Sequence, residues 1–161
     1  MMSTRDQKDL KKEIAELYSE GVAAALGTKK DKFEYLRLEN REDAYAVNGE
    51  LTFIRVDGKL FPFINYLAEN NVPIQKIVVD MGAVRFMMSG ADVMRPGIVK
   101  ISETIEKDDI VAIVEETHGK PLSIGRAMYD AAEIQAKDSG KVVKTIHHFG
   151  DKFYEFAKTY M

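Results

Sequence analysis

Apolar residues recur with two different periods along this chain, and the change of period separates a helical start from shorter extended stretches. From Thr4 or Asp6 to near Gly27 the apolar positions are spaced three and four apart, which is typical of an amphipathic helix. They are Leu10, Ile14, Leu17, Tyr18, Val22 and Ala25. We expect this stripe to pack on the sheet that follows, although a partner-binding face would show the same pattern.

Short alternating stretches separated by turn residues follow this helix. The expected strands are 33–39, 44–47 and 51–56, and the expected turns are Asn48-Gly49 and Asp57-Gly58. Asn-Gly favours a type I′ hairpin, because both central residues of that turn need positive φ. Pro62 suits the first turn of a helix that would carry Phe63, Tyr66 and Leu67. The first part of the chain is therefore predicted to be a helix, an antiparallel meander and a helix.

The stretch Asn70-Asn71-Val72-Pro73 is the expected domain boundary. Asn and Pro favour turns, and Pro73 excludes a helix that continues through it. The sequence thus predicts two domains, 1–73 and 74–161, that meet near residues 72–75.

The second domain is predicted to be a closed, small β-barrel with two short helices. Its strands are expected at 77–79, in the stretch directly after the Pro96-Gly97 turn, and at 110–116, 122–127, 142–149 and 152–156. Asp130 with Glu133 forms a capping-box pattern, which predicts a helix over 131–137. The adjacent acids Glu115-Glu116 are expected to lie on a solvated edge.

The other short helix lies in a segment that combines a strand, a capped helix and a chain reversal. Asp80 is expected to act as the helix N-cap, and Gly82 leaves backbone N–H groups open to an anion such as a phosphate. Gly90 is expected to end the helix in a left-handed conformation, and Pro96-Gly97 to turn the chain.

The order of residues in this segment resembles the start of a PUA domain, an RNA-binding barrel named after pseudouridine synthases and archaeosine transglycosylases. The order is Asp-x-Gly-Ala from Asp80, five residues, Ser-Gly-Ala from Ser89, and then Pro96-Gly97. Upstream, 47–55 and 60–62 resemble the pre-PUA domain of the malignant T-cell-amplified-sequence family, whose larger relative is ligatin. The resemblance runs from about Phe33 to Phe156 and implies an α+β fold, with a pre-PUA domain over 1–73 and a PUA domain over 74–161.

The resemblance also implies a function. Members of that family bind RNA in translation, so we expect binding to transfer RNA near its 3′ acceptor end, to the small ribosomal subunit, or to both, during initiation, reinitiation or recycling. A density-regulated-protein-like partner is expected to bind through residues 1–73. The RNA-binding residues that the resemblance implies are Gly82, Ala83, Arg85, Ser89, Arg95 and Gly97. Lys141, Lys144 and Lys152 are candidates to extend this surface along the last strands.

Composition narrows these expectations. The net charge of −3 argues against coating nucleic acid non-specifically, so an RNA site must be a local patch. The chain has no cysteine, which fits a reducing compartment, and its polar N-terminus predicts neither a signal peptide nor a membrane span. We therefore expect a cytoplasmic protein. Phe86, Met87 and Met88 are expected to be mostly core, with one of them partly exposed to stack on an unpaired base.

No group of residues predicts catalysis, a metal or a cofactor. The adjacent His147 and His148 lie in a predicted strand and point to opposite faces, so they cannot hold one metal ion together. Two alternatives to the leading interpretation stay open. The chain could be an accessory RNA-binding subunit of an enzyme such as a pseudouridine synthase or a tRNA-guanine transglycosylase. It could also be a protein-interaction module that does not bind RNA, which the acidic balance would favour.

Overall fold

The computed structural model describes residues 1–160, which divide into two compact units. Unit 1 comprises Met1–Pro73 together with the residues from Ala157 onward, and unit 2 comprises Ile74–Phe156. The sequence interpretation assigned all of 74–161 to the second domain, whereas here the C-terminal residues group with unit 1. None of the helices within residues 1–160 is both long enough and apolar enough to cross a bilayer.

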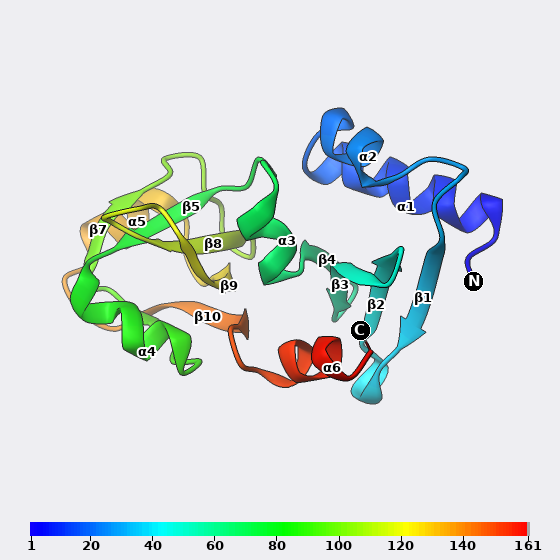
Figure 1. The fold of residues 1–161 in the computed structure, drawn as a ribbon. Coiled ribbons are helices and arrows are strands. Elements are labelled where there is room, and N and C mark those ends of the chain that lie inside the picture. The colour runs from blue at the N-terminus through cyan, green and yellow to red at the C-terminus, as the bar shows by residue number, and fades with distance from the viewer. Residues whose placement is uncertain (161) are drawn as a thin grey trace. The chain divides into compact units, whose positions relative to one another are not determined.

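Unit 1 is built on a four-stranded antiparallel sheet in the order β1-β2-β3-β4 (Figure 1). Its strands are β1 (Phe33–Arg37), β2 (Asp43–Val47), β3 (Glu50–Val56) and β4 (Lys59–Pro62), with the 3-10 turn η1 (Glu39–Arg41) between β1 and β2. Helices α1 (Thr4–Leu17) and α2 (Glu20–Leu26) precede the sheet, and α3 (Ile64–Glu69) follows it. The predicted order of helix, antiparallel meander and helix is confirmed.

The first helix ends earlier than its apolar spacing predicted. Ser19 breaks it, because the Ser19 side chain accepts a hydrogen bond from Val22 N at 3.0 Å and caps a new helix, α2. Leu10 and Ile14 are buried as expected, but Leu17, at the break, is 54% exposed. Only part of the predicted apolar stripe is therefore buried against the rest of unit 1.

The turn residues of unit 1 behave as predicted, whereas the position of Pro62 was predicted wrongly. Asn48 and Gly49 both have positive φ, 52° and 84°, as a type I′ hairpin requires. Pro62 is the last residue of β4, where it pairs with Phe53, and not the first turn of a helix. The chain stays extended because Phe63 is buried and its N–H donates to the Thr52 carbonyl at 2.8 Å, so α3 begins only at Ile64.

Unit 2 is a six-stranded sheet in the order β6-β10-β9-β8-β5-β7. The strands are β5 (Lys76–Val79), β6 (Val93–Met94), β7 (Ile98–Ile101), β8 (Ile110–Glu115), β9 (Pro121–Ala127) and β10 (Lys141–His148). Only β5 and β8 pair in parallel among these neighbours. The sheet curls into a half-barrel, which confirms the predicted small β-barrel, although it keeps open edges at β6 and β7 and is not fully closed.

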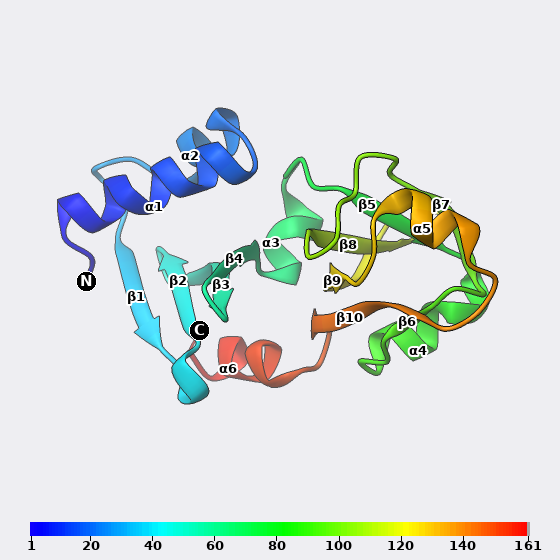
Figure 2. The same ribbon diagram turned by 180° about the vertical axis from the view of Figure 1, so that it is seen from behind.

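Short helices cover this curled sheet. They are η2 (Met81–Ala83) with α4 (Val84–Met88), and α5 (Ala131–Ala136), which lies against the sheet in Figure 2. Ala131 and Ile134 of α5 join Met87 of α4 in one apolar core with strand residues such as Ile77 and Val143. Asp130 has the backbone conformation of an N-cap, but its side chain accepts from Lys107 N at 2.7 Å instead of completing the predicted capping box.

The segment predicted as a closing strand over 152–156 forms the start of helix α6 (Lys152–Tyr160) instead. Gly150, with φ of 80°, ends β10 in a turn, and the Asp151 side chain then accepts from Tyr154 N at 3.0 Å. Phe153 and Ala157 are both buried, and their spacing of four places them on one helical face. A local cap and a helical apolar spacing thus outweigh the tendency of aromatic residues to form strands.

Candidate nucleic-acid interface

The start of the helical segment of unit 2 is held by Asp80. Its side-chain Oδ1 accepts from Ala83 N at 3.0 Å, as the sequence predicted for an N-cap. Its own backbone N–H donates to the Gly97 carbonyl at 2.8 Å. Gly97 has φ of 97°, and a Cβ placed on it would lie 3.8 Å from the Ala83 Cβ. The two halves of the sequence motif, Asp-x-Gly-Ala and Pro-Gly, are therefore direct neighbours.

Gly82 is exposed at this helix start, but the helix behind it is short. Met81–Ala83 form a 3-10 turn and only Val84–Met88 are α-helical. So few aligned peptide groups give a small macrodipole, which attracts an anion only weakly. An anion here would depend mainly on open backbone N–H groups and on nearby cationic side chains.

The α4 helix presents a mixed cationic and apolar surface. Arg85 is exposed, and its guanidinium carbon lies 5.0 Å from the centre of the Phe86 ring. Phe86 is 51% exposed and Met88 is 45% exposed, while Met87 is buried. The prediction that these three apolar residues are mostly core is therefore wrong, because a helix of one and a half turns buries only one face. The Ser89 hydroxyl donates to the Phe86 carbonyl at 2.8 Å and so helps to end the helix.

Arg95 has a structural role that the sequence did not reveal. It is half-buried, and its Nε donates to the Ile134 carbonyl at 2.8 Å, at the C-terminal part of α5. Its backbone N–H donates to the Gly140 carbonyl, also at 2.8 Å. Arg95 thus ties the turn after β6 to the segment between α5 and β10.

Two of the three candidate lysines lie together on β10. Lys141 pairs in register with Met94 of β6, and its Nζ lies 3.0 Å from Asp92 Oδ2. Burial works to raise the pKa of the Asp92 carboxyl, but the Thr145 N–H and the charges of Lys141 and Lys144 act against it and hold that pKa below its ordinary value. Asp92 therefore offsets part of the positive charge of this edge.

Lys152, the third candidate, lies apart from these two, at the first residue of α6. Its Nζ is 5.1 Å from the centre of the Phe153 ring. The structure therefore joins Gly82, Ala83 and Gly97 around Asp80, and Lys141 and Lys144 around Asp92, while Arg85 and Ser89 share α4.

His148 contacts the C-terminal end of α4, and the sequence analysis did not predict this contact. Its Nδ1 lies 3.1 Å from the Met88 carbonyl, and a Cβ placed on Gly90 would be only 2.5 Å from its Nε2. The imidazole therefore packs directly on the C-terminus of α4. No pattern in the sequence signals this contact, because the two residues are 60 positions apart.

The side chains of His147, Asp151 and Glu115 form hydrogen bonds within unit 2 and so stabilise the fold. The fully buried His147 places Nδ1 2.7 Å from Asp151 Oδ2. Glu115 was predicted on a solvated edge but is 5% exposed, because its carboxylate accepts from His118 N and from Lys120 N within the hairpin turn. Within residues 1–160, no three His, Asp or Glu side chains gather as metal ligands would.

Comparison with known proteins gives this geometry a context. Residues 75–149 match the PUA domain family. The chain is 35% identical over 155 residues to an uncharacterized protein of Methanocaldococcus jannaschii, covering 96% of this chain and 94% of that protein. It is 30% identical to Translation machinery-associated protein 20 of Saccharomyces cerevisiae, covering 94% of this chain and 88% of that protein. It is also 30% identical to Malignant T-cell-amplified sequence 1 of Danio rerio, covering 82% of this chain and 75% of that protein.

A solved structure shows the same fold. A hypothetical protein of Pyrococcus horikoshii OT3 is 35% identical and superposes with a TM-score of 0.83, covering 97% of both chains. The similarity therefore extends over both units of the chain and not over the PUA domain alone.

Proposed function

The chain belongs to the family of Translation machinery-associated protein 20 and Malignant T-cell-amplified sequence 1, and from this membership we propose that it is a non-enzymatic, cytoplasmic, RNA-binding protein of translation. The names of both relatives and the PUA domain support this proposal. An acidic chain of this kind would bind RNA through one local surface and not by its overall charge.

The observation that carries the proposal is the composition of the α4 surface. Arg85 can donate paired hydrogen bonds to a phosphate or a base edge, because its guanidinium is planar. Beside it, Phe86 and Met88 expose apolar area on which an unpaired base can stack. Cationic and stacking groups on one short helix are the combination that single-stranded nucleic acid requires.

The surroundings of α4 extend this interface. Gly82, Ala83 and Gly97 leave the backbone around Asp80 without bulky side chains, so a phosphate can approach it closely. Lys141 and Lys144 add positive charge along β10. Ser89 and Arg95 would act mainly by holding α4 and the turn before β7, and Lys152 would contribute at the margin.

Exposed stacking groups beside cationic side chains suit an RNA with a free single-stranded end. The end of a transfer RNA has this form, so we assign the 3′ acceptor end of transfer RNA as the ligand. The small ribosomal subunit would be the place of action, during initiation, reinitiation or recycling. Residues 1–73, which form most of unit 1, would provide the surface for a density-regulated-protein-like partner.

Crosslinking of the full chain in native extract, followed by sequencing of the bound RNA, tests the proposal. We expect reads from transfer RNA ends and from small-subunit ribosomal RNA. Enrichment of modification-guide RNA would instead make the chain an accessory of an RNA-modifying enzyme. The absence of any enriched RNA, with the protein recovered folded, would mean that unit 2 is a protein-interaction module.

A further inference from the structure

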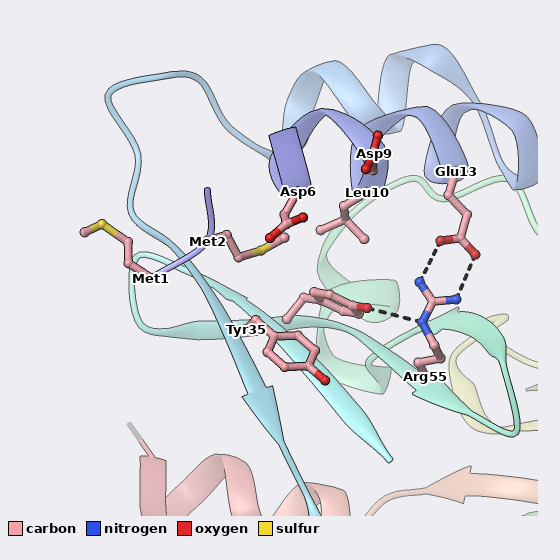
Figure 3. A pocket seen from close by; sticks show the side chains of 9 residues that line it. Met1, Met2, Asp6, Asp9, Leu10, Glu13, Tyr35 and Arg55 are labelled. Atoms are coloured by element: carbon pink, nitrogen blue, oxygen red, sulfur yellow. Dashed lines mark hydrogen bonds and ion pairs between the residues drawn. The ribbon is translucent and has the colours of Figure 1, made fainter. Parts of the chain in front are cut away.

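Unit 1 contains a cavity of about 380 Å³ between α1 and the strands β1 to β3. Figure 3 shows it from close by, with Asp6 and Leu10 projecting from α1 toward the side where Tyr35 lies. A cavity of this size is at the lower end of the range of about 300–1,000 Å³ for small-ligand sites, so it suits a single side chain. It belongs entirely to unit 1 and takes no part in the RNA interface proposed for unit 2.

One wall of the cavity is a single face of α1. Asp6, Asp9, Leu10 and Glu13 line it, and their spacing of three and four residues places them on one side of the helix. The Ser3 side chain caps this helix by accepting from Asp6 N at 3.1 Å, which fixes the position of the face. Met2, which is buried, donates its backbone N–H to the Phe33 carbonyl at 2.9 Å and closes one end of the cavity.

The charges of the lining leave two carboxylates without a partner. Glu13 accepts from both terminal nitrogens of Arg55, at 2.6 and 2.9 Å, so these two charges satisfy each other. Within residues 1–160, the carboxylates of Asp6 and Asp9 take part in no hydrogen bond or ion pair. Asp6 lies in the first turn, where the helix dipole favours an acid, but Asp9 lies a turn further on, where the dipole does not account for it.

The opposite wall is aromatic, and its two tyrosine rings already lie beside guanidinium groups of this chain. Tyr35 and Tyr45 are cross-strand partners with ring centres 5.8 Å apart. The guanidinium carbon of Arg37 lies 5.9 Å from the Tyr35 ring, and that of Arg55 lies 5.7 Å from the Tyr45 ring. Tyr35 is still 40% exposed, so part of its ring is open to a further contact.

From this lining we propose that the cavity binds the side chain of an arginine in a basic segment of a partner protein. Asp6 and Asp9 would accept from the guanidinium, Tyr35 would contact its face, and Leu10 and Met2 would contact its methylene groups. The charge of the lining selects the occupant, because two unpaired carboxylates attract a cation and repel a phosphate. RNA is thereby directed away from this side of unit 1.

The test is an NMR titration of the isotope-labelled full chain with N-acetyl-arginine methylamide. The matched probes are the lysine and norleucine methylamides, which change the cation or remove it. We expect saturable shifts of the amides of Asp9, Leu10 and Tyr35 with the arginine probe, weaker shifts with lysine and none with norleucine. The double variant Asp6→Asn/Asp9→Asn should weaken arginine binding by about twofold to thirtyfold, the range for two exposed ion pairs.

The control is Glu16→Gln/Glu20→Gln, which changes the net charge equally at exposed positions that do not line the cavity. Equal weakening by both double variants would mean that only the net charge matters and would overturn the proposal. Lysine or norleucine binding as well as arginine would overturn the assignment of a guanidinium site. The same amides shifting with a single-stranded oligonucleotide would show that the cavity takes nucleic acid, and no shift with any probe would show that it takes none of these ligands.

Discussion

The backbone N–H of Asp80 donates to the carbonyl of Gly97 across 2.8 Å, which joins residues 17 positions apart in the sequence. This bond places the turn before β7 beside the start of the helical segment. The Asp80 side chain then caps that segment through Ala83 N. The order of residues that marks the family is thus one local structure, in which a cap and a reversal support each other.

Replacing Asp80 tests the cap. Asp80→Ala should lower the free energy of unfolding by about 1 kcal/mol, because Ala83 N loses its side-chain acceptor. Asp80→Asn keeps an acceptor oxygen and should cost only a few tenths of a kcal/mol. Urea denaturation of both variants measures the difference in the free energy of unfolding. If Asp80→Ala and Asp80→Asn were equally stable, the cap would contribute nothing.

Arg85 is the residue with which to test the RNA interface. Arg85→Ala should weaken binding of labelled transfer RNA by roughly 1–3 kcal/mol if the guanidinium makes a paired contact. Arg5→Ala removes the same charge from an exposed position on α1 and should be nearly neutral. Titrations with folding checked by circular dichroism give both values. A larger loss for Arg5→Ala would place the site on unit 1 and contradict the proposal.

The salt dependence of the same titration tests how small the interface is. An interface that neutralises two to four phosphates should give a slope of log affinity against log salt of about −2 to −4. Arg85→Ala should make this slope shallower by about 1 if that residue contacts a phosphate. A slope near zero would mean that Phe86 and Met88 provide nearly all of the binding through stacking.

The sequence predicted features that depend on neighbours along the chain. The Asn48-Gly49 hairpin, the Asp80 cap, the positive φ of Gly90 and the turn at Pro96-Gly97 are all present, because the chemistry of each turn lies within it. The strand predicted at 152–156 was wrong. Its aromatic residues favour strands, but Asp151 caps this segment as a helix.

Contacts between distant residues could not be predicted. Arg95 binds the carbonyl of Ile134, which is 39 residues away, and His148 contacts the carbonyl of Met88, which is 60 residues away. Both depend on how β10 and α5 pack, and no local pattern encodes that. The exposure of Phe86 was missed for the related reason that the length of α4 decides how many faces it buries.

The buried pair His147 and Asp151 gives a prediction for acid stability. Burial works to raise the pKa of the Asp151 carboxyl, but the hydrogen bond and charge of His147 and the N–H groups of Tyr154 and His148 lower it below its ordinary value. A lowered pKa stabilises the fold above the unfolded value of about 3.9, and this contribution is lost as pH falls through the folded pKa.

Asp151→Asn should therefore cost about 1–3 kcal/mol at pH 7, and the gap to the parent should narrow below about pH 4. The control Asp138→Asn is exposed and should leave the free energy of unfolding within about 0.5 kcal/mol of the parent across this range. Chemical denaturation at several pH values measures the gap. A gap that stays constant down to pH 3 would show that the Asp151 charge does not stabilise the fold.

The energetic effect of the contact between Gly90 and His148 can be measured separately from backbone strain, because Gly140 has nearly the same φ as Gly90. Gly90 has φ of 90° and Gly140 has φ of 92°, so alanine at either position meets the same backbone strain of about 1–2 kcal/mol. At Gly140 no atom lies within 4 Å of the added Cβ, whereas at Gly90 the His148 Nε2 lies 2.5 Å from it. Gly90→Ala should therefore cost more than Gly140→Ala, by about 1–3 kcal/mol of overpacking.

The double variant Gly90→Ala/His148→Ala separates the two causes. Removing the imidazole abolishes the clash, so Gly90→Ala in that background should cost only as much as Gly140→Ala. Urea denaturation of the four-member cycle gives the coupling energy, which we expect to be about 1–3 kcal/mol. Additivity within about 0.5 kcal/mol would mean that His148 does not rest on the end of α4, and the imidazole would then not support the helix that we propose as the RNA site.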